Sequence, residues 1–331
     1  MAPLETATIG KTGLRVTTLG LGGAPLGGNF ASVTEDSASR TVGRALDLGV
    51  RYFDTAPLYG HGKSEGLFGR GLARAERDTF VLSTKVGRVV NPTAANVDAG
   101  TWIDPLPYEV VFDFSRDGVL RSLEDSLRRL DMDRIDIALI HDPDDHHDQA
   151  ISEAFPALAE LRSQGVVGAI GAGMNQWEAL ARFAVEGDFD CFLLAGRYTL
   201  LDQSGLAELL PLCEQKGISV ILGGPYNSGV LASDLSGSAT YFYAATPPEV
   251  LQRAREIKTV CDRHEVPLKA AALQFGLAHP AVAATIPGAQ SVAELEENVA
   301  MVQLPIPGAL WDELRGQHLI PAEAPTPPPA H

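Results

Sequence analysis

Two kinds of hydrophobic pattern alternate along the chain. Short apolar runs are typical of buried β-strands, and each is followed by a segment in which apolar residues recur every three or four positions, as in an amphipathic helix. The runs that predict strands lie at 19–24, 50–54, 80–86, 135–141, 167–173, 190–195, 218–223 and 282–287. The segments that predict helices lie at 35–48, 64–75, 116–131, 152–164, 176–186, 204–216, 248–264 and 291–300.

Repeated strand–helix units predict an α/β fold, a (β/α)8 TIM barrel. A doubly wound open sheet is the alternative, but Gly20–Pro25 lacks the third glycine of a dinucleotide fingerprint and has a proline in its place. Residues 5–18 predict an amino-terminal β-hairpin with its turn at Gly10–Gly13. Inserts at 89–115 and 231–246 predict long loops at the carboxyl-terminal face.

Residues 1–320 are expected to form a single barrel domain. The last residues, 321–331, are rich in proline and alanine and predict a disordered tail.

Composition narrows the function classes. A formal net charge of −16 argues against nucleic acid and anionic membrane surfaces as partners. No apolar stretch is long enough to span a membrane, and residues 1–10 do not resemble a secretion signal. The cysteines form no C-x-x-C pair, which favours a reducing compartment. We expect a cytoplasmic protein, monomer or homodimer, that acts on a small-molecule substrate.

Titratable side chains stand where successive predicted strands end. Asp54 ends one strand, Tyr59 follows on the next loop, Lys85 ends the second strand and His141 ends the third. Each residue alone could be a solvated edge charge or a loop residue. In a barrel, however, the carboxyl ends of the strands meet at one face, and this face carries the active site. The pattern therefore predicts that these four side chains lie together.

This set of groups is suited to proton transfer. A lysine ammonium beside a tyrosine favours the phenolate and is expected to lower the tyrosine pKa from about 10. Asp54 would keep Lys85 charged, and His141 could orient a substrate oxygen by a hydrogen bond. The set needs neither a nucleophile nor a metal, so it fits an alcohol or carbonyl reaction in which a nicotinamide cofactor carries the hydride.

The same residues belong to a longer series of motifs that resembles the aldo-keto reductase superfamily over almost the whole chain. The motifs are Phe-Asp-Thr-Ala-x-x-Tyr-Gly at 53–60, Ser-Thr-Lys-Val-Gly at 83–87, Asp136 with His141, Gly-Ala-Gly-Met-Asn at 171–175 and Ile-Pro-Gly at 286–288. The resemblance implies that Tyr59 is the proton-transfer residue, that Asp54 and Lys85 assist it, and that His141 orients the substrate. It also implies that Asn175 binds the nicotinamide carboxamide.

Within that superfamily, residues 111–122 and 194–201 are similar to bacterial sugar 1-dehydrogenases, of the D-threo-aldose or L-fucose type, and to pyridoxal 4-dehydrogenases. The resemblance implies NAD-dependent oxidation of a cyclic sugar hemiacetal at C1 to the lactone. The alternatives are oxidation of the pyridoxal hemiacetal to 4-pyridoxolactone, general carbonyl reduction, and a regulatory subunit that binds the cofactor without turnover.

NAD is expected in preference to NADP. The segment 288–294 has no lysine or arginine to bind a 2′-phosphate, and Glu294 would repel one. Ser291 and Glu294 also fit a helix capping box, and the two roles are compatible. The residues expected at the cofactor are Gly22, Asn175, Gly224, Pro225, Tyr226, Ser228, Gly288, Gln290, Glu294 and Asn298.

Two further side chains are expected at the substrate beside His141, namely Trp102 and Arg197. Relatives commonly place a tyrosine that stacks on the nicotinamide where this chain has Gly223–Tyr226, so the source of stacking is left open.

The segment His141–Asp148 suggests a different class, a metal-dependent barrel hydrolase, because it contains three histidines and four aspartates. Barrel metal sites draw ligands from several strand ends, whereas these residues share one loop. No metal is therefore expected.

Overall fold

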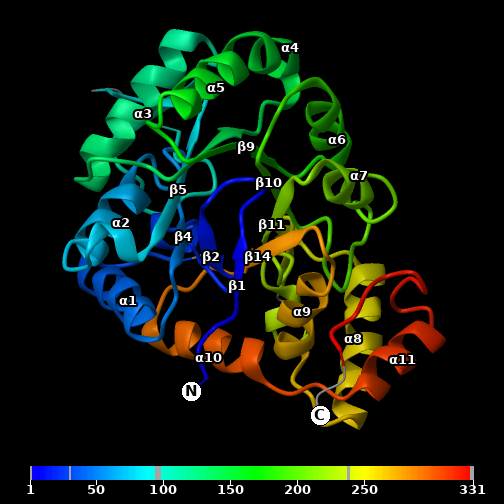
Figure 1. The fold of residues 1–331 in the computed structure, drawn as a ribbon. Helices are drawn as coiled ribbons and strands as arrows, with labels where there is room; N and C mark the ends of the chain where they lie inside the picture. The colour runs from blue at the N-terminus through cyan, green and yellow to red at the C-terminus, as the bar shows by residue number, and fades with distance from the viewer. Residues whose placement is uncertain (1, 30, 94–97, 237–238, 329–331) are drawn as a thin grey trace.

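The computed structural model describes residues 2–29, 31–93, 98–236 and 239–328. Eight parallel strands lie in the order β14-β11-β10-β9-β8-β5-β4-β3, and bridges from Leu19 to Thr285 and from Gly22 to Gly288 join the two ends of this sheet (Figure 1). The predicted TIM barrel is confirmed. Its strands are β3 Leu21–Gly22, β4 Tyr52–Asp54, β5 Val81–Val86, β8 Ile137–His141, β9 Ala169–Met174, β10 Cys191–Ala195, β11 Ser219–Gly223 and β14 Val282–Ile286.

The main helices surround the strands (Figure 1). In α1, for example, Thr34 caps the first turn and the apolar side chains of Ala38, Val42 and Ala45 are buried. The α-helices are α1 Glu35–Asp47, α2 Lys63–Leu72, α3 Arg116–Leu130, α4 His147–Gln149, α5 Phe155–Ser163, α6 Trp177–Glu186, α7 Leu209–Lys216, α8 Pro248–Arg263, α9 Leu268–Leu277, α10 Val292–Gln303 and α11 Gly308–Gly316. Shorter helical turns are η1 Pro25–Gly27, η2 Arg77–Thr79, η3 Asp144–His146, η4 Ala150–Ala154 and η5 Val230–Ala232.

The strands bury both faces. Along β8, Ile137 and Leu139 belong to a cluster inside the barrel, whereas Ala138 and Ile140 belong to the core between strands and helices. This alternation follows from the two-residue period of a strand. The predicted amino-terminal hairpin, β1 Thr6–Thr8 with β2 Arg15–Thr17, contributes Val16 to the inner cluster and covers that end of the barrel (Figure 1).

Both inserts contain a hairpin that the sequence did not predict. In the first insert β6 Arg88–Pro92 pairs with β7 Tyr108–Phe112, and in the second β12 Thr240–Tyr241 pairs with β13 Ala244–Ala245. Each is an isolated antiparallel pair beside the barrel sheet. The first insert therefore contains a pair of antiparallel strands.

Three helical segments differ from the prediction. Helix α9 lacks an amphipathic pattern because it is buried on nearly every side, between α10, α8 and β14. Helix α11 follows Pro307 in a stretch for which the sequence pattern predicts no element. Helix α7 begins at Leu209 rather than at 204, because Asp202 accepts hydrogen bonds from Ser204 and holds that part in a turn.

Part of the carboxyl-terminal tail is packed, contrary to the prediction of disorder. Ala324 is buried, and Arg315 donates hydrogen bonds to the carbonyl oxygen of Ala324 and to the hydroxyl of Thr326. The arginine of α11 thus holds this segment against the helix. Residues 329–331 lie outside the described part of the chain.

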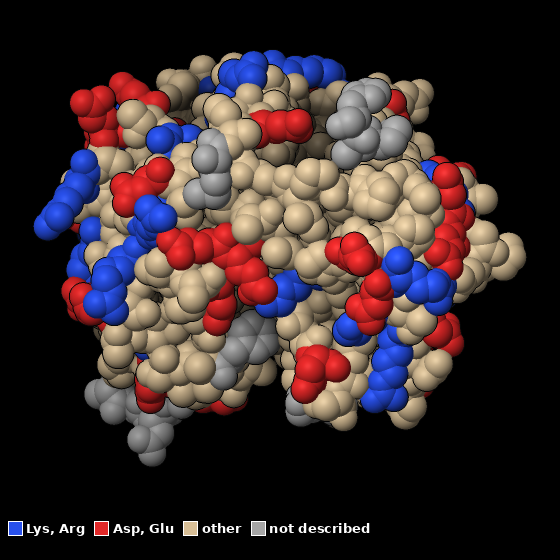
Figure 2. Space-filling view, turned by 90° about the horizontal axis from the view of Figure 1, so that it is seen from below, with Lys and Arg blue, Asp and Glu red and all other residues tan. Residues whose placement is uncertain are grey.

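None of the helices in the described ranges is both long and apolar enough for a membrane span. Figure 2 shows one face of the molecule, on which acidic and basic side chains are interspersed.

Helix α11 should be an integral part of the core, although it follows the last barrel unit. Trp311 is 1 % exposed and its ring lies 6.3 Å from that of Phe275 in α9. Replacing Trp311 with alanine should lower the free energy of unfolding by about 3–5 kcal/mol in urea titrations, because a large buried side chain is lost. The control Val185→Ala, at an exposed position, should stay within about 0.5 kcal/mol. If both variants lowered the free energy of unfolding by the same small amount, α11 would not be an integral part of the core.

Candidate active site

The loop after β4 places Tyr59 at the carboxyl-terminal face. The strand ends at Asp54, and the chain then turns through Pro57 and Gly60 before α2 begins. Gly60 has a φ of +62°, and a Cβ atom there would lie 2.3 Å from the carbonyl oxygen of Gly27. Only glycine combines this backbone conformation with so close an approach. The turn that carries Tyr59 is therefore held against the loop after β3.

Lys85 is the centre of the predicted set. Its ammonium group is buried and donates hydrogen bonds to Oδ2 of Asp54 at 2.8 Å, to the carbonyl oxygen of Thr55 at 2.9 Å and to the Tyr59 hydroxyl at 3.0 Å. The other carboxylate oxygen of Asp54 accepts a hydrogen bond from Ser83 at 2.7 Å. Asp54, Tyr59 and Lys85 are thus brought together as the sequence predicted.

The balance of charge and burial determines the protonation of this set. Burial is the largest influence on Lys85 and lowers its pKa, but the charges of Asp54 and Tyr59 and the hydrogen bonds to both together outweigh burial and raise the pKa, so the ammonium stays charged. Burial is also the largest influence on Tyr59 and raises its pKa to about 12, against the opposing effect of Lys85. The expectation of a lowered tyrosine pKa was wrong, because sequence reasoning included the lysine but not the loss of water.

His141 is the last residue of β8, and its ring lies against that of Tyr59. The two rings are 5.8 Å apart and nearly perpendicular. Burial, with Lys85 and Arg88 nearby, lowers the pKa of His141, so the imidazole is neutral at pH 7. Its Nδ1 atom is buried and finds no hydrogen-bond partner within the described ranges, while Nε2 lies 3.5 Å from the carboxylate of Asp142. A proton on Nε2 is therefore favoured over one on Nδ1.

A cavity of about 340 Å³ opens beside Asp54 and Tyr59, between the ends of β3, β10, β11 and β14. Several glycines contribute to its wall, among them Gly22, Gly224 and Gly288. At Gly288 a Cβ atom would lie 2.3 Å from the ring of Pro25, so glycine is needed for this close approach of the two loops. Of the expected cofactor residues, those that line the cavity are Gly22, Asn175, Gly224, Pro225, Tyr226, Ser228, Gly288, Gln290 and Glu294.

Asn298, the remaining expected cofactor residue, is not among the residues that line this cavity. It accepts a hydrogen bond from the Tyr226 hydroxyl at 2.7 Å and donates one to the carbonyl oxygen of Gly288 at 3.4 Å. It thereby joins the loop after β11 to the loop after β14. Asn175 lines the cavity and donates to the carbonyl oxygen of Ala195 at 2.8 Å, which orients its amide.

One half of the predicted capping box is present at the start of α10, where Ser291 accepts a hydrogen bond from the Glu294 backbone. The Glu294 carboxylate accepts its hydrogen bond from the backbone of Gln290, one residue before the cap, at 2.8 Å. Glu294 also lines the cavity. In the described part of its wall, the cavity has no lysine or arginine.

The cavity has further lining residues beyond the expected cofactor set. Asn29 and Tyr243 share a side-chain hydrogen bond, and both line the cavity, as does Phe242. The aromatic stretch 241–243 was the available signal for the last two. Asn227 also lines it, and its buried Oδ1 atom has no partner among the described residues. This orphaned acceptor suits a bound cofactor that brings its own hydrogen-bond donors.

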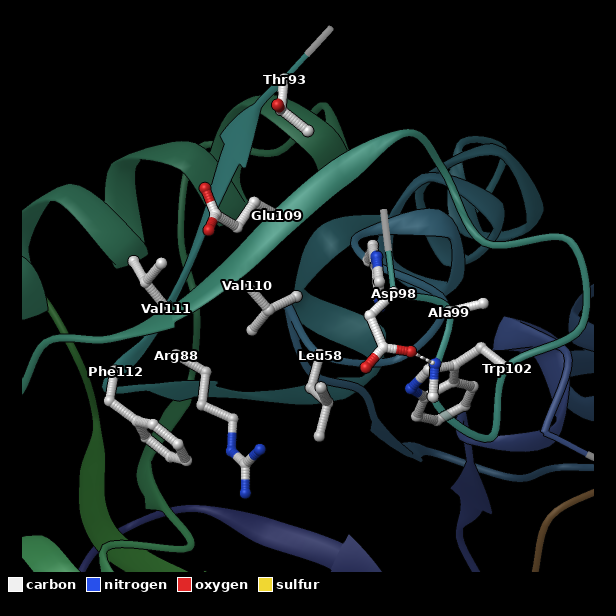
Figure 3. Close-up of a pocket in the computed structure, with 12 residues that line it drawn as sticks. Leu58, Arg88, Thr93, Asp98, Ala99, Trp102, Glu109, Val110, Val111 and Phe112 are labelled. Atoms are coloured by element: carbon white, nitrogen blue, oxygen red, sulfur yellow. Dashed lines mark hydrogen bonds between the residues drawn. The ribbon is translucent and has the colours of Figure 1, made fainter. Parts of the chain in front are cut away.

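A second cavity, of about 430 Å³, lies beside the β6–β7 hairpin (Figure 3). Trp102, expected at the substrate, lines this space, and its ring lies 5.7 Å from that of Tyr59. The cavity is lined by Leu58, His61, Arg88, Thr93, Asp98, Ala99, Gly100, Trp102, Glu109, Val110, Val111 and Phe112.

Arg197 is not among the lining residues of either cavity. Its guanidinium group pairs with Asp202 at 2.9 Å and lies 4.3 Å from the ring centre of Phe242. Arg197 thus contacts a residue that lines the first cavity, and its expected role at the substrate stays a prediction.

The side chains of the acidic and histidine-rich segment 141–148 contact different neighbours and do not converge on one point. His147 pairs with Glu186 at 2.8 Å, His146 lies against Phe112, and Asp148 pairs with Arg182 at 3.3 Å. Within the described ranges, no group of three or more histidine, cysteine, aspartate or glutamate side chains could hold a metal ion.

The buried ion pair at the centre of the site should matter for stability as well as for chemistry. Lys85→Met leaves the Asp54 carboxylate buried without its countercharge and should lower the free energy of unfolding by about 3–5 kcal/mol. The double variant Asp54→Asn/Lys85→Met should recover much of this loss. Lys258→Met, which removes a lysine from an exposed pair with Asp262, should cost less than about 1 kcal/mol. Urea unfolding measures all three variants. If Lys85→Met left the free energy of unfolding unchanged, the assigned interaction between Asp54 and Lys85 would be contradicted.

Comparisons with known proteins agree with this geometry. Residues 18–316 match the model of the aldo/keto reductase family. The chain is 40 % identical to a pyridoxal 4-dehydrogenase of Microbacterium luteolum, over 96 % of this chain and 98 % of that protein. It is also 40 % identical to a D-threo-aldose 1-dehydrogenase of a Pseudomonas species, over 93 % of this chain and 96 % of that protein. A holo aldo-keto reductase structure from Bacillus halodurans superposes with a TM-score of 0.74 at 26 % identity, covering 97 % of this chain and 98 % of the other. The chain belongs to the aldo/keto reductase family of oxidoreductases, which use nicotinamide cofactors.

Proposed function

We propose that this protein catalyses the NAD-dependent oxidation of a sugar hemiacetal, of the L-fucose or D-threo-aldose type, at C1 to the lactone. The observation that carries the proposal is the convergence of Asp54, Tyr59, Lys85 and His141 at the edge of the glycine-walled cavity. The substrate class rests on the similarity to D-threo-aldose 1-dehydrogenase.

Tyr59 is the residue that exchanges a proton with the reacting oxygen. At pH 7 its hydroxyl is neutral, since its pKa is raised to about 12, so it is a proton donor when a carbonyl is reduced. For oxidation the phenol must first lose its proton, and the Lys85 ammonium at 3.0 Å stabilises the resulting phenolate. Oxidation should therefore become faster as the pH rises.

His141 holds the reacting oxygen. A neutral imidazole with its proton on Nε2 donates one hydrogen bond and carries no charge that would compete with Tyr59 for the substrate proton. Lys85 and Asp54 do not need to touch the substrate. Their pairing fixes the Tyr59 hydroxyl and keeps a positive charge beside it.

The cofactor cavity supplies the second half of the site. When bound, the nicotinamide cofactor takes up the hydride. Asn175 would hold the carboxamide, and the loops that contain 224–228 and 288–294 would enclose the rest of the cofactor. Because Glu294 stands at the cavity and no basic side chain lines its described part, NAD is favoured over NADP.

Pyridoxal is the second candidate substrate, since it also closes to an internal hemiacetal. The similarity to a pyridoxal 4-dehydrogenase favours it, as does the Trp102 ring beside Tyr59, which could stack on a pyridine ring. General carbonyl reduction would use the same proton donor. A regulatory subunit without turnover is the non-enzymatic alternative, and any substantial turnover excludes it.

A substrate panel tests the proposal. Purified protein should form NADH, measured by its absorbance, from NAD with at least one of L-fucose, D-arabinose and L-galactose, and more slowly from pyridoxal. With NADP, kcat/KM should fall by about 10- to 100-fold, because the 2′-phosphate meets a carboxylate instead of a basic group. Glu294→Gln should narrow this ratio, while Ser291→Ala, which weakens only the cap, should leave the ratio unchanged. Turnover of pyridoxal alone would move the assignment to that substrate.

Replacing Tyr59 with phenylalanine should lower kcat by about 10²- to 10⁴-fold, because the proton-transfer group is lost. NADH binding, followed by fluorescence titration, should change little. The control is Tyr198→Phe, at a buried tyrosine whose hydroxyl has no partner in the described ranges, and it should retain full activity. A Tyr59→Phe enzyme with most of its activity would refute the assigned role.

A further inference from the structure

A second ion pair borders the catalytic set. Arg88, at the start of β6, donates a hydrogen bond to Oδ2 of Asp142 at 2.8 Å, and its guanidinium group lies 4.7 Å from the ring centre of Phe112. Both charged side chains are largely buried, with exposed fractions of 18 % for Arg88 and 26 % for Asp142. Figure 3 shows Arg88 and Phe112 next to each other below the hairpin. The pair therefore forms part of the wall at the carboxyl-terminal face.

This pair has hydrogen-bonding capacity to spare. The guanidinium group of Arg88 has five N–H donors, and its hydrogen bond to Asp142 uses one of them. The carboxylate of Asp142 has room for further donors beyond the one from Arg88. Arg88 also borders two cavities, the one beside Trp102 and another of about 310 Å³ that Asp142 and Asn175 line. A ligand in this region thus meets a donor and an acceptor side by side.

The pair is within reach of the reacting atoms. A substrate oxygen that accepts a hydrogen bond from Nε2 of His141 lies about 2.8 Å from that nitrogen. The Oδ2 atom of Asp142 lies 3.5 Å from the same nitrogen. The two oxygens are therefore separated by at most about 6 Å. A hydroxyl group on the carbon next to the reacting one can bridge this gap.

A hydroxyl group is also the substituent that uses both partners. It can donate to the carboxylate of Asp142 and accept from the guanidinium of Arg88, whereas a carbonyl can only accept and a methylene can do neither. A substrate without this hydroxyl would leave the charged pair partly desolvated and without compensation.

We propose that Arg88 and Asp142 are specificity-determining residues that select a substrate with a hydroxyl group on the carbon adjacent to the reacting carbon. This inference rests on the proposed function, since it assumes that His141 holds the reacting oxygen. It assigns to the Arg88–Asp142 pair the recognition of α-hydroxylated hemiacetals over their deoxy analogues.

The test compares an aldose with its 2-deoxy analogue. D-Arabinose and 2-deoxy-D-ribose are a matched pair, because they differ only in the hydroxyl at C2. For the wild-type enzyme, kcat/KM for the best aldose should exceed that for its 2-deoxy analogue by about 10- to 100-fold, the value of a hydrogen bond to a charged group. Asp142→Asn and Asp142→Ala should lower kcat/KM for the aldose by about 10- to 100-fold more than for the 2-deoxy analogue, so that the ratio between the two substrates falls to within about threefold of one.

The control variant is Asp148→Asn, which removes an exposed carboxylate from the same loop, where Asp148 pairs with Arg182. This variant should leave kcat/KM unchanged for both the aldose and its 2-deoxy analogue. Equal wild-type turnover of the aldose and its analogue would overturn the inference. Equal losses on both substrates in the Asp142 variants would also overturn it, because they would assign Asp142 a purely structural role or a role in placing His141. Wild-type inactivity on every aldose would instead refute the proposed function itself, before any variant is made.

Discussion

An ammonium group buried beneath the rim of the barrel holds the site together. Removing such a group from water costs several kcal/mol unless its hydrogen bonds are all made. Lys85 has three N–H donors, and Asp54, Thr55 and Tyr59 each accept one. Two strands and the loop between β4 and α2 are therefore tied to a single atom. The position of the Tyr59 hydroxyl follows from this requirement as much as from the backbone turn that carries it.

The same requirement explains why most of the central site could be predicted from the sequence. Parallel strands bring their carboxyl ends to one edge, so recognising where the apolar runs end also places Asp54, Lys85 and His141 near one another. Tyr59 lies five residues beyond Asp54, within the short loop that follows. What the order of residues does not reveal is how much water remains around them. The pKa of Tyr59 depends on that quantity, and its direction was therefore predicted incorrectly.

Local partners account for the other differences. Arg197 was expected at the substrate, and the structure adds that Asp202, only five residues away, pairs with its guanidinium group. Helix α9 escaped prediction because a helix enclosed on all sides has no polar face, and periodicity is the signal that identifies a helix. The helices of the eight strand–helix units were predictable for the opposite reason, since each faces the barrel on one side and water on the other. The roles of the individual site residues remain predictions.

The cavity beside Tyr59 occupies a particular place in the architecture, because it lies across the seam where the first and last barrel strands meet. Gly22 from one side and Ile286, Pro287 and Gly288 from the other all line it, and the bridge from Gly22 to Gly288 is part of the closure. A ligand that contacts both sides of this seam binds only while β3 and β14 stay together. By thermodynamic linkage, its binding free energy stabilises the closed barrel against separation of these two strands. Occupancy of the cavity and opening of the barrel at this seam are thus linked equilibria, so amide exchange along β3 and β14 would report on bound ligand even in an enzyme that cannot turn over.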